Sequence, residues 1–232
     1  MAKTRSIVLA MFLLMFTLAT SANAGITTYS GFDIGANAPG VNSNTAAAQF
    51  DAAAPGDSII TFESAPLGSF TSLIAAPGVT LTGIDYYGNL QTIRNTTDCG
   101  NALCGNNTTS GGSQFLYVYG GTATFTFASP VTSFGAYISG NQVQGINFSF
   151  DDGGPQQVLL PYDYDNGGFS FVGFTDTSAF SSVTVDAAFP HGDFISVDDV
   201  RYGAFSRVPE PSSLLLLASG LAGLAGLAWR KK

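Results

Sequence analysis

The sequence predicts an all-β protein: an antiparallel β-sandwich, jelly-roll-like, with a short N-terminal helix and a C-terminal transmembrane helix. Short apolar and aromatic runs recur between residues 58 and 202 with no helical segments between them. Glycine, serine, threonine and asparagine separate these runs, as in strands joined by turns. In several runs apolar and polar residues alternate, which places one face of each strand against a core.

Residues 1–24 have the organisation of a secretory signal peptide. Lys3 and Arg5 supply the positive start, residues 7–18 are almost entirely apolar, and Ala22 and Ala24 place small residues at the cleavage site. The apolar run is too short to span a bilayer comfortably. We therefore expect signal peptidase to cleave after Ala24 and the body, residues 25–207, to be exported.

One helix is expected near the start of the body. Residues 45–54 are rich in alanine, Asn44 can cap their N-terminus, and Pro55 and Gly56 end the run. The remaining elements are expected to be strands: 58–63, 79–83, 115–119, 122–128, 131–139, 145–150, 157–160, 169–175, 180–187 and 194–202.

The C-terminal segment has the sequence features of a membrane anchor. Residues 212–229 carry no charge and form about 27 Å of helix, just enough for a hydrocarbon core. Trp229 lies where an interfacial aromatic residue is expected, and Arg230, Lys231 and Lys232 favour the cytoplasmic side. The body is then expected on the periplasmic side of an inner-membrane-anchored precursor.

The stretch "VPEPSSLLLLASGLAGLAGLAWRKK" resembles the PEP-CTERM sorting signal of Gram-negative bacteria, which is a Pro-Glu-Pro motif, a transmembrane helix and a basic end in fixed order. The resemblance implies that Pro209, Glu210 and Pro211 are the sorting motif of segment 208–232. It also implies processing by a membrane exosortase, followed by release or attachment at the cell surface. The two prolines favour extended backbone, which a protease can bind. The alternative is a permanent anchor.

The net charge of the body limits the kinds of molecule that it can bind. Residues 25–208 contain three arginines and no lysine against fifteen acidic residues, a net charge of −12. Because no basic cluster exists to neutralise phosphates, nucleic-acid binding is excluded. The acidic groups can bind divalent cations or simply keep an exported domain soluble.

Cys99 and Cys104 are the two cysteines, and an oxidising compartment favours a disulfide between them. A zinc site lacks ligands because His191 is the single histidine. Glu63, Asp198 and Asp199 are the candidate ligands for a structural Ca²⁺, since jelly-roll carbohydrate-binding modules often hold calcium between an early strand and the last one. The alternative is that these carboxylates lie in an ordinary strand and its turn.

Four tyrosines in polar, turn-like surroundings are candidates for stacking on sugar rings: Tyr86, Tyr87, Tyr162 and Tyr164. A packing role is the alternative. No nucleophile motif of the G-x-S-x-G kind occurs. The sequence therefore predicts an exported, non-enzymatic surface or matrix protein with a structural or glycan-binding role and extracellular polysaccharide as a partner. The alternative function is a secreted polysaccharide-acting hydrolase.

Overall fold

The computed structural model describes residues 25–85, 87–97, 101–142, 146–151, 154–158, 163–187 and 193–204. Within these ranges, no helix is long and apolar enough to cross a membrane. The leader, the sorting segment and the predicted transmembrane helix lie outside the described residues.

The described chain is built mostly of β-strands with two helices. The helices are α2 (Val41–Ala53) and α3 (Asn101–Cys104). The strands are β1 (Thr27–Ile34), β2 (Ser58–Ile60), β3 (Gly68–Ser69), β4 (Leu73–Ala76), β5 (Val79–Ile84), β6 (Thr92–Arg94), β7 (Phe115–Tyr119), β8 (Thr122–Ser139), β9 (Ile146–Phe150), β10 (Gly154–Val158), β11 (Gly168–Asp186) and β12 (Phe194–Gly203).

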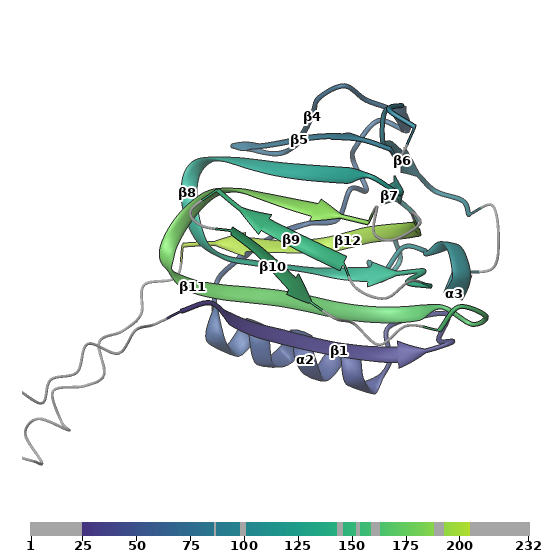
Figure 1. Ribbon diagram of the computed structural model, residues 1–232, viewed down its shortest axis with the longest axis horizontal. Coiled ribbons are helices and arrows are strands. Elements are labelled where there is room, and N and C mark those ends of the chain that lie inside the picture. Colours follow the sequence, from purple (N-terminus) through teal and green to yellow (C-terminus); the bar gives the residue numbers. More distant parts are fainter. Residues whose placement is uncertain are drawn as a thin grey trace, which may run out of the picture.

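All strand pairs are antiparallel and belong to one hydrogen-bonded sheet that folds into two layers (Figure 1). The long strands β8 and β11 run through both layers. Residues 122–127 of β8 pair with β5, and residues 122–126 also pair with the late part of β11, whereas residues 133–139 pair with β12 and the early part of β11. Their mutual register shifts between Thr175 and Ser182, where both strands bend.

The all-β antiparallel class is therefore confirmed, but some predicted elements were wrong. Four segments that were expected as separate strands are joined into two continuous ones. The segments expected at 122–128 and 131–139 are joined in β8, and those expected at 169–175 and 180–187 are joined in β11. Ser129 and Pro130 interrupt the apolar pattern of β8 and are exposed at its bend, so the sequence suggests a break where the backbone continues.

The core fills the space between the two layers. Inward-facing phenylalanines meet across it, with ring centroids 5.4 Å apart for Phe125 and Phe134 and 4.9 Å apart for Phe148 and Phe174. All four side chains are fully buried. Burial of a side chain of this size contributes on the order of 2 kcal/mol, so these contacts are a principal source of stability.

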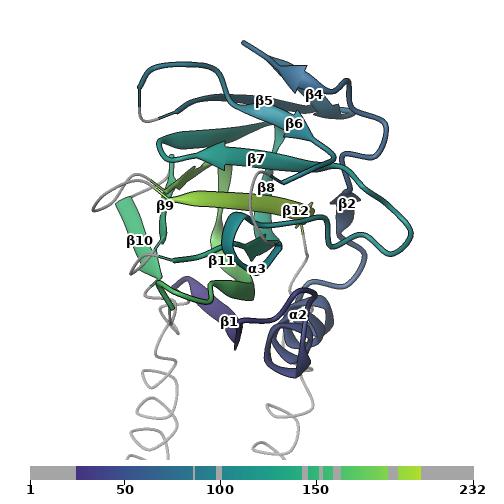
Figure 2. The same cartoon turned by 90° about the vertical axis from the view of Figure 1, so that its right-hand side faces the viewer.

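Helix α2 covers the outer face of the layer formed by β1, β11 and β8, at the base of the molecule in Figure 2. Phe50 packs on Phe171 with ring centroids 5.6 Å apart. Gly173 permits this approach, because a Cβ there would lie 2.5 Å from Phe50 Cδ2.

The helix begins four residues earlier than predicted, and the expected Asn44 cap was wrong. Asp33 of β1 caps it instead: its carboxylate accepts hydrogen bonds from the backbone N–H groups of Gly40, Asn42 and Ser43 at 3.1, 3.0 and 2.9 Å. Partial burial opposes ionisation of Asp33, but these bonds outweigh it and lower its pKa. The cap comes from the preceding strand, seven residues before Gly40, and not from a residue at the helix start, where a capping pattern is sought.

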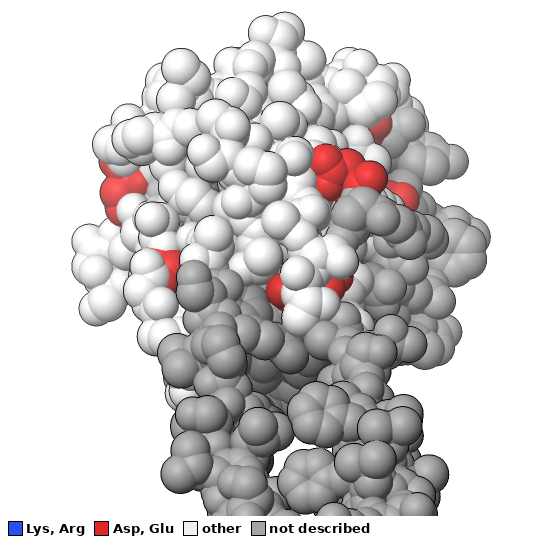
Figure 3. All heavy atoms as spheres, turned by 90° about the vertical axis from the view of Figure 1, so that its left-hand side faces the viewer, with Lys and Arg blue, Asp and Glu red and all other residues white. Residues whose placement is uncertain are grey.

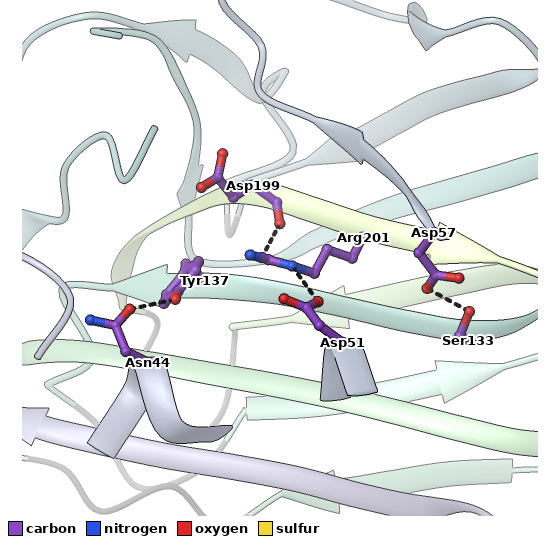
Figure 4. A network of polar contacts seen from close by, with 7 residues as sticks. All are labelled: Asn44, Asp51, Asp57, Ser133, Tyr137, Asp199 and Arg201. Carbon is purple, nitrogen blue, oxygen red and sulfur yellow. Dashed lines mark hydrogen bonds and ion pairs between the residues drawn. The ribbon is translucent and has the colours of Figure 1, made fainter. Parts of the chain in front are cut away.

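A polar network joins α2 to the sheet (Figure 4). Arg201 of β12 forms an ion pair with Asp51 of α2, Nε to Oδ1, at 2.9 Å, and its Nη1 donates to the Asp199 carbonyl at 3.0 Å. The Tyr137 hydroxyl donates to Asn44 Oδ1 at 2.7 Å. One of the two described arginines is therefore used to fix the helix.

Candidate functional site

The predicted calcium ligand Glu63 lies just beyond β2 and holds the segment that enters β7. Its Oε1 accepts hydrogen bonds from Asn107 Nδ2 at 3.0 Å and from the backbone N–H groups of Ser113 and Gln114, each at 2.9 Å. Burial opposes ionisation of Glu63, but these bonds outweigh it and lower its pKa. Glu63 is thus an ionised acceptor that fixes the backbone of residues 113–114.

Asp198 and Asp199 of β12 hold the preceding part of the same segment. Asp198 Oδ2 accepts from the backbone N–H of Thr108 at 2.7 Å and of Thr109 at 3.2 Å. Asp199 Oδ1 accepts from the Thr109 hydroxyl at 2.6 Å. The three carboxylates therefore bind one segment, residues 107–114, from β12 and from the segment that follows β2.

Asp198 differs from the other two carboxylates because it is fully buried. Burial raises its pKa from the ordinary 3.8 to about 7, against the lowering effect of the Thr108 bond. Its Oδ1 atom has no hydrogen-bond partner among the described residues. Asp199, beside it, has a φ of 44°, a strained value for a residue with a side chain.

These contacts leave calcium binding by Glu63, Asp198 and Asp199 a prediction. Among the described residues, no group of three or more His, Cys, Asp or Glu side chains is placed to hold a metal ion. The disulfide also stays a prediction: Cys104 is buried at the end of α3, and Cys99 lies outside the described residues.

Two of the four predicted glycan contacts, Tyr86 and Tyr162, lie outside the described residues. The other two are the most exposed tyrosines of the described chain, with exposed fractions of 69% for Tyr87 and 73% for Tyr164. A packing role for these two side chains is not supported by such exposure. Both are available to a ligand in solution.

Tyr87 belongs to a row of aromatic rings that we call the aromatic strip: Tyr87, Tyr119, Phe194 and Tyr117. The Tyr119 and Phe194 rings are stacked, with centroids 4.1 Å apart, and Tyr87 lies 5.9 Å from Tyr119. Tyr117 lies 6.1 Å from Phe194 and carries the Arg94 guanidinium 4.0 Å above its ring centre. The strip thus has an exposed end at Tyr87 and a buried, cation-covered end at Tyr117.

The strip arises from the pairing of β7 with β12, in which Tyr119 is directly opposite Phe194. Leu116 and Val118 of β7 enter the core, so Tyr117 and Tyr119 point to the other face. Sequence reasoning assigned these residues to strands and missed their role. The signal that could have found them is the alternation in "FLYVY", where both tyrosines share a face.

The loop that carries Tyr87 is held firmly. Asp85 accepts hydrogen bonds from the backbone N–H groups of Tyr87 at 2.8 Å and Asn89 at 2.7 Å. The buried Gln91 amide donates to the Ile84 carbonyl at 2.8 Å, and its Oε1 accepts from the Tyr119 backbone N–H at 3.1 Å. Gln91 therefore ties the Tyr87 loop to the end of β7, which fixes the spacing of the strip.

Tyr164 is connected to the same end of β12. Its carbonyl accepts from Gln142 Nε2 at 2.7 Å, and the Gln142 backbone N–H donates to Asp193 Oδ2 at 2.6 Å. Asp193 Oδ1 accepts in turn from the Phe194 backbone N–H at 2.7 Å. Hydrogen bonds therefore connect the backbone of Tyr164 to the first residue of β12 through Gln142 and Asp193.

The surface around these residues is acidic. The described residues include thirteen Asp and Glu side chains and two arginines, Arg94 and Arg201, which contact Tyr117 and Asp51. Figure 3 shows acidic groups and no Lys or Arg on the described part of one face. Such a surface repels polyanions.

A groove of about 350 Å³ is lined by Phe127, Pro130 and Tyr202, among others, and extends to Ala204, at the other end of β12 from the strip.

Taken together, these features define a β-sandwich protein with a row of aromatic rings that is exposed at one end, at Tyr87. The family described as the PEP-CTERM protein-sorting motif matches residues 207–232, so the chain carries this C-terminal sorting signal, as an exosortase substrate does. The signal implies an exported, membrane-anchored precursor that is processed toward the cell surface. No curated protein sequence matches the chain.

Several solved structures are distantly similar. An adhesin domain of Lys-gingipain (Kgp) is 15% identical, with a TM-score of 0.43, and the match covers 63% of this chain and 99% of that one. A family 29 carbohydrate-binding module is 14% identical, with a TM-score of 0.30 and coverage of 59% and 97%. TmCBM61 in complex with β-1,4-galactotriose is 12% identical, with a TM-score of 0.31 and coverage of 63% and 95%. Likeness at this level identifies no function.

Proposed function

We propose that this protein is a non-enzymatic glycan-binding protein of the bacterial surface or extracellular matrix, with a body of jelly-roll-like type. Its leader is removed after Ala24, and its tail holds the body on the periplasmic side until an exosortase cuts near Pro209. Extracellular polysaccharide is the partner. The aromatic strip is the observation that carries this proposal.

The strip suits sugar rings because tyrosine offers an apolar face and a hydrogen-bonding hydroxyl together. Tyr87 is largely exposed, while Asp85 and Gln91 hold its loop through hydrogen bonds. Because the loop that carries Tyr87 is already fixed, it loses little conformational entropy when a ligand binds. Because the surrounding surface is acidic, the favoured glycans are those without carboxylate or sulfate groups.

Affinity electrophoresis of the full-length protein in detergent tests the proposal. The probes are a neutral β-glucan, a neutral galactan, the anionic polymer alginate and exopolysaccharide purified from the producing bacterium. We expect retardation by a neutral polymer or by the exopolysaccharide, and none by alginate. Tyr87→Ala removes one stacking contact, worth about 1 kcal/mol, and should weaken binding roughly fivefold to tenfold.

Val41→Ala is the matched control, because Val41 is 81% exposed at the start of α2, outside the strip. Equal binding by the wild-type protein and Tyr87→Ala would contradict the role of the strip. The alternative, a polysaccharide-acting hydrolase, predicts that the probe shortens during incubation. We expect the length of the polymer, measured by size-exclusion chromatography, to stay constant.

A further inference from the structure

Both ends of the described body leave the sandwich on the same side. Thr27, at the start of β1, pairs with Thr175 of β11, and Thr175 pairs with Ser133 of β8. Ser133 pairs in turn with Gly203, the last residue of β12. These four residues form one row across the sheet. The start of β1 and the end of β12 lie at the left-hand side of Figure 1. We call this side the anchor end.

The aromatic strip lies at the other end of β12. Phe194 is the first residue of this strand and Gly203 is the last. Nine residue steps of extended strand span about 30 Å. One strand therefore separates the point where the chain leaves the body from the surface that is proposed to bind glycan.

The sorting signal begins soon after the anchor end. Ala204 is the last described residue of the body, and the matched motif starts at residue 207. Eight residues lead from Ala204 to Ser212, where the uncharged run begins, and they span at most about 29 Å. The anchor end is thus held close to the membrane, whereas the strip lies about 30 Å further along β12.

We propose that the membrane-anchored precursor presents the aromatic strip on the side facing away from the bilayer, so that it binds glycan before its tail is cut. This inference rests on the proposed glycan-binding function. Polysaccharide can then be captured by the precursor at the membrane, and cutting the tail releases a protein that already carries its ligand.

The test uses the full-length protein in phosphatidylcholine vesicles that contain phosphatidylglycerol and a headgroup-linked energy acceptor. A donor dye is attached at Leu90→Cys, beside Tyr87, or at Ser129→Cys, which lines the groove at the anchor end. Both sites are exposed. The wild-type protein reports background labelling of Cys99 and Cys104. Energy transfer should be at least about twofold stronger from position 129, because the two sites lie near opposite ends of a roughly 30 Å strand.

Equal or stronger transfer from position 90 would overturn the proposed orientation. A second measurement compares binding of the glycan probe by the protein in vesicles and in detergent, and equal affinities are expected. Binding in detergent that is lost in vesicles would overturn this inference and leave the proposed function standing. Loss of binding in both states would overturn the proposed function itself.

Discussion

The buried carboxylate of Asp198 predicts an unusual dependence of stability on pH. Its pKa in the folded protein is about 7, above the ordinary 3.8, because burial disfavours the charged form. Between these values the folded protein keeps a proton that the unfolded chain has lost. The free energy of unfolding therefore falls as pH rises through this window, and the full cost of the buried charge remains above pH 7.

The magnitude follows from the size of the shift. Each pH unit within the window changes the free energy of unfolding by about 1.4 kcal/mol, so the two units between pH 5 and pH 7 amount to about 3 kcal/mol. For a body of this size, this corresponds to a decrease in melting temperature of roughly 6–12 °C. The pKa values of Asp33 and Glu63 are lowered from ordinary values of 3.8 and 4.5, so these groups do not oppose the change between pH 5 and pH 7.

The assay is thermal unfolding followed by circular dichroism at pH 5 and pH 8 for the wild-type protein and for Asp198→Asn. The variant retains an oxygen for the Thr108 and Thr109 donors but cannot ionise, so its profile should lack this decrease. Asp165→Asn, at an exposed site, is the control and should behave as the wild type does. The reasoning is refuted if the wild-type protein and Asp198→Asn respond equally to pH.

Four further outcomes are expected. Asp33→Ala removes the cap of α2 and should lower the free energy of unfolding by about 1 kcal/mol in urea titrations, whereas an unchanged midpoint would contradict that role. Gly173→Ala forces a Cβ against Phe50 and should cost about 1–3 kcal/mol, and Phe50→Leu in the same chain should recover part of it. If Glu63 and its partners bind calcium, millimolar Ca²⁺ should raise the melting temperature over that in EDTA, and Glu63→Gln should abolish the difference; no shift in the wild type argues against the site. Mass spectrometry of the mature protein should find an N-terminus at residue 25 and a C-terminus near residue 209, and a product that retains Lys232 would contradict cleavage by an exosortase.

The sequence predicts the class of fold well because alternation is a local property. "INFSF" shows its buried face directly, and Ile146, Phe148 and Phe150 all enter the core. The continuity of β8 and β11 is not a local property. Turn-forming or polar residues at their bends indicate an end of a strand, and only pairing with distant strands shows that the backbone continues.

The candidate site depends on the same distinction. Tyr87 and Tyr164 were singled out because they stand in polar surroundings, and both are exposed in the structure, while contact with a glycan stays a prediction. Tyr119 and Phe194 are 75 positions apart, and only the register of β7 with β12 brings their rings together. Likewise, no spacing in the sequence shows that Asp33 caps α2 or that Asp198 binds the segment before β7.

The position of β12 also has a mechanical consequence. If polysaccharide is held beside Phe194 while the chain is tethered beyond Gly203, tension runs along the length of this strand. β12 is hydrogen bonded to β8 on one side and to β7 and β2 on the other. A load parallel to a strand shears many of these bonds at once instead of opening them one by one, since they lie perpendicular to it. The fold thus places a strand that is hydrogen bonded on both sides in the line of force between cell and matrix.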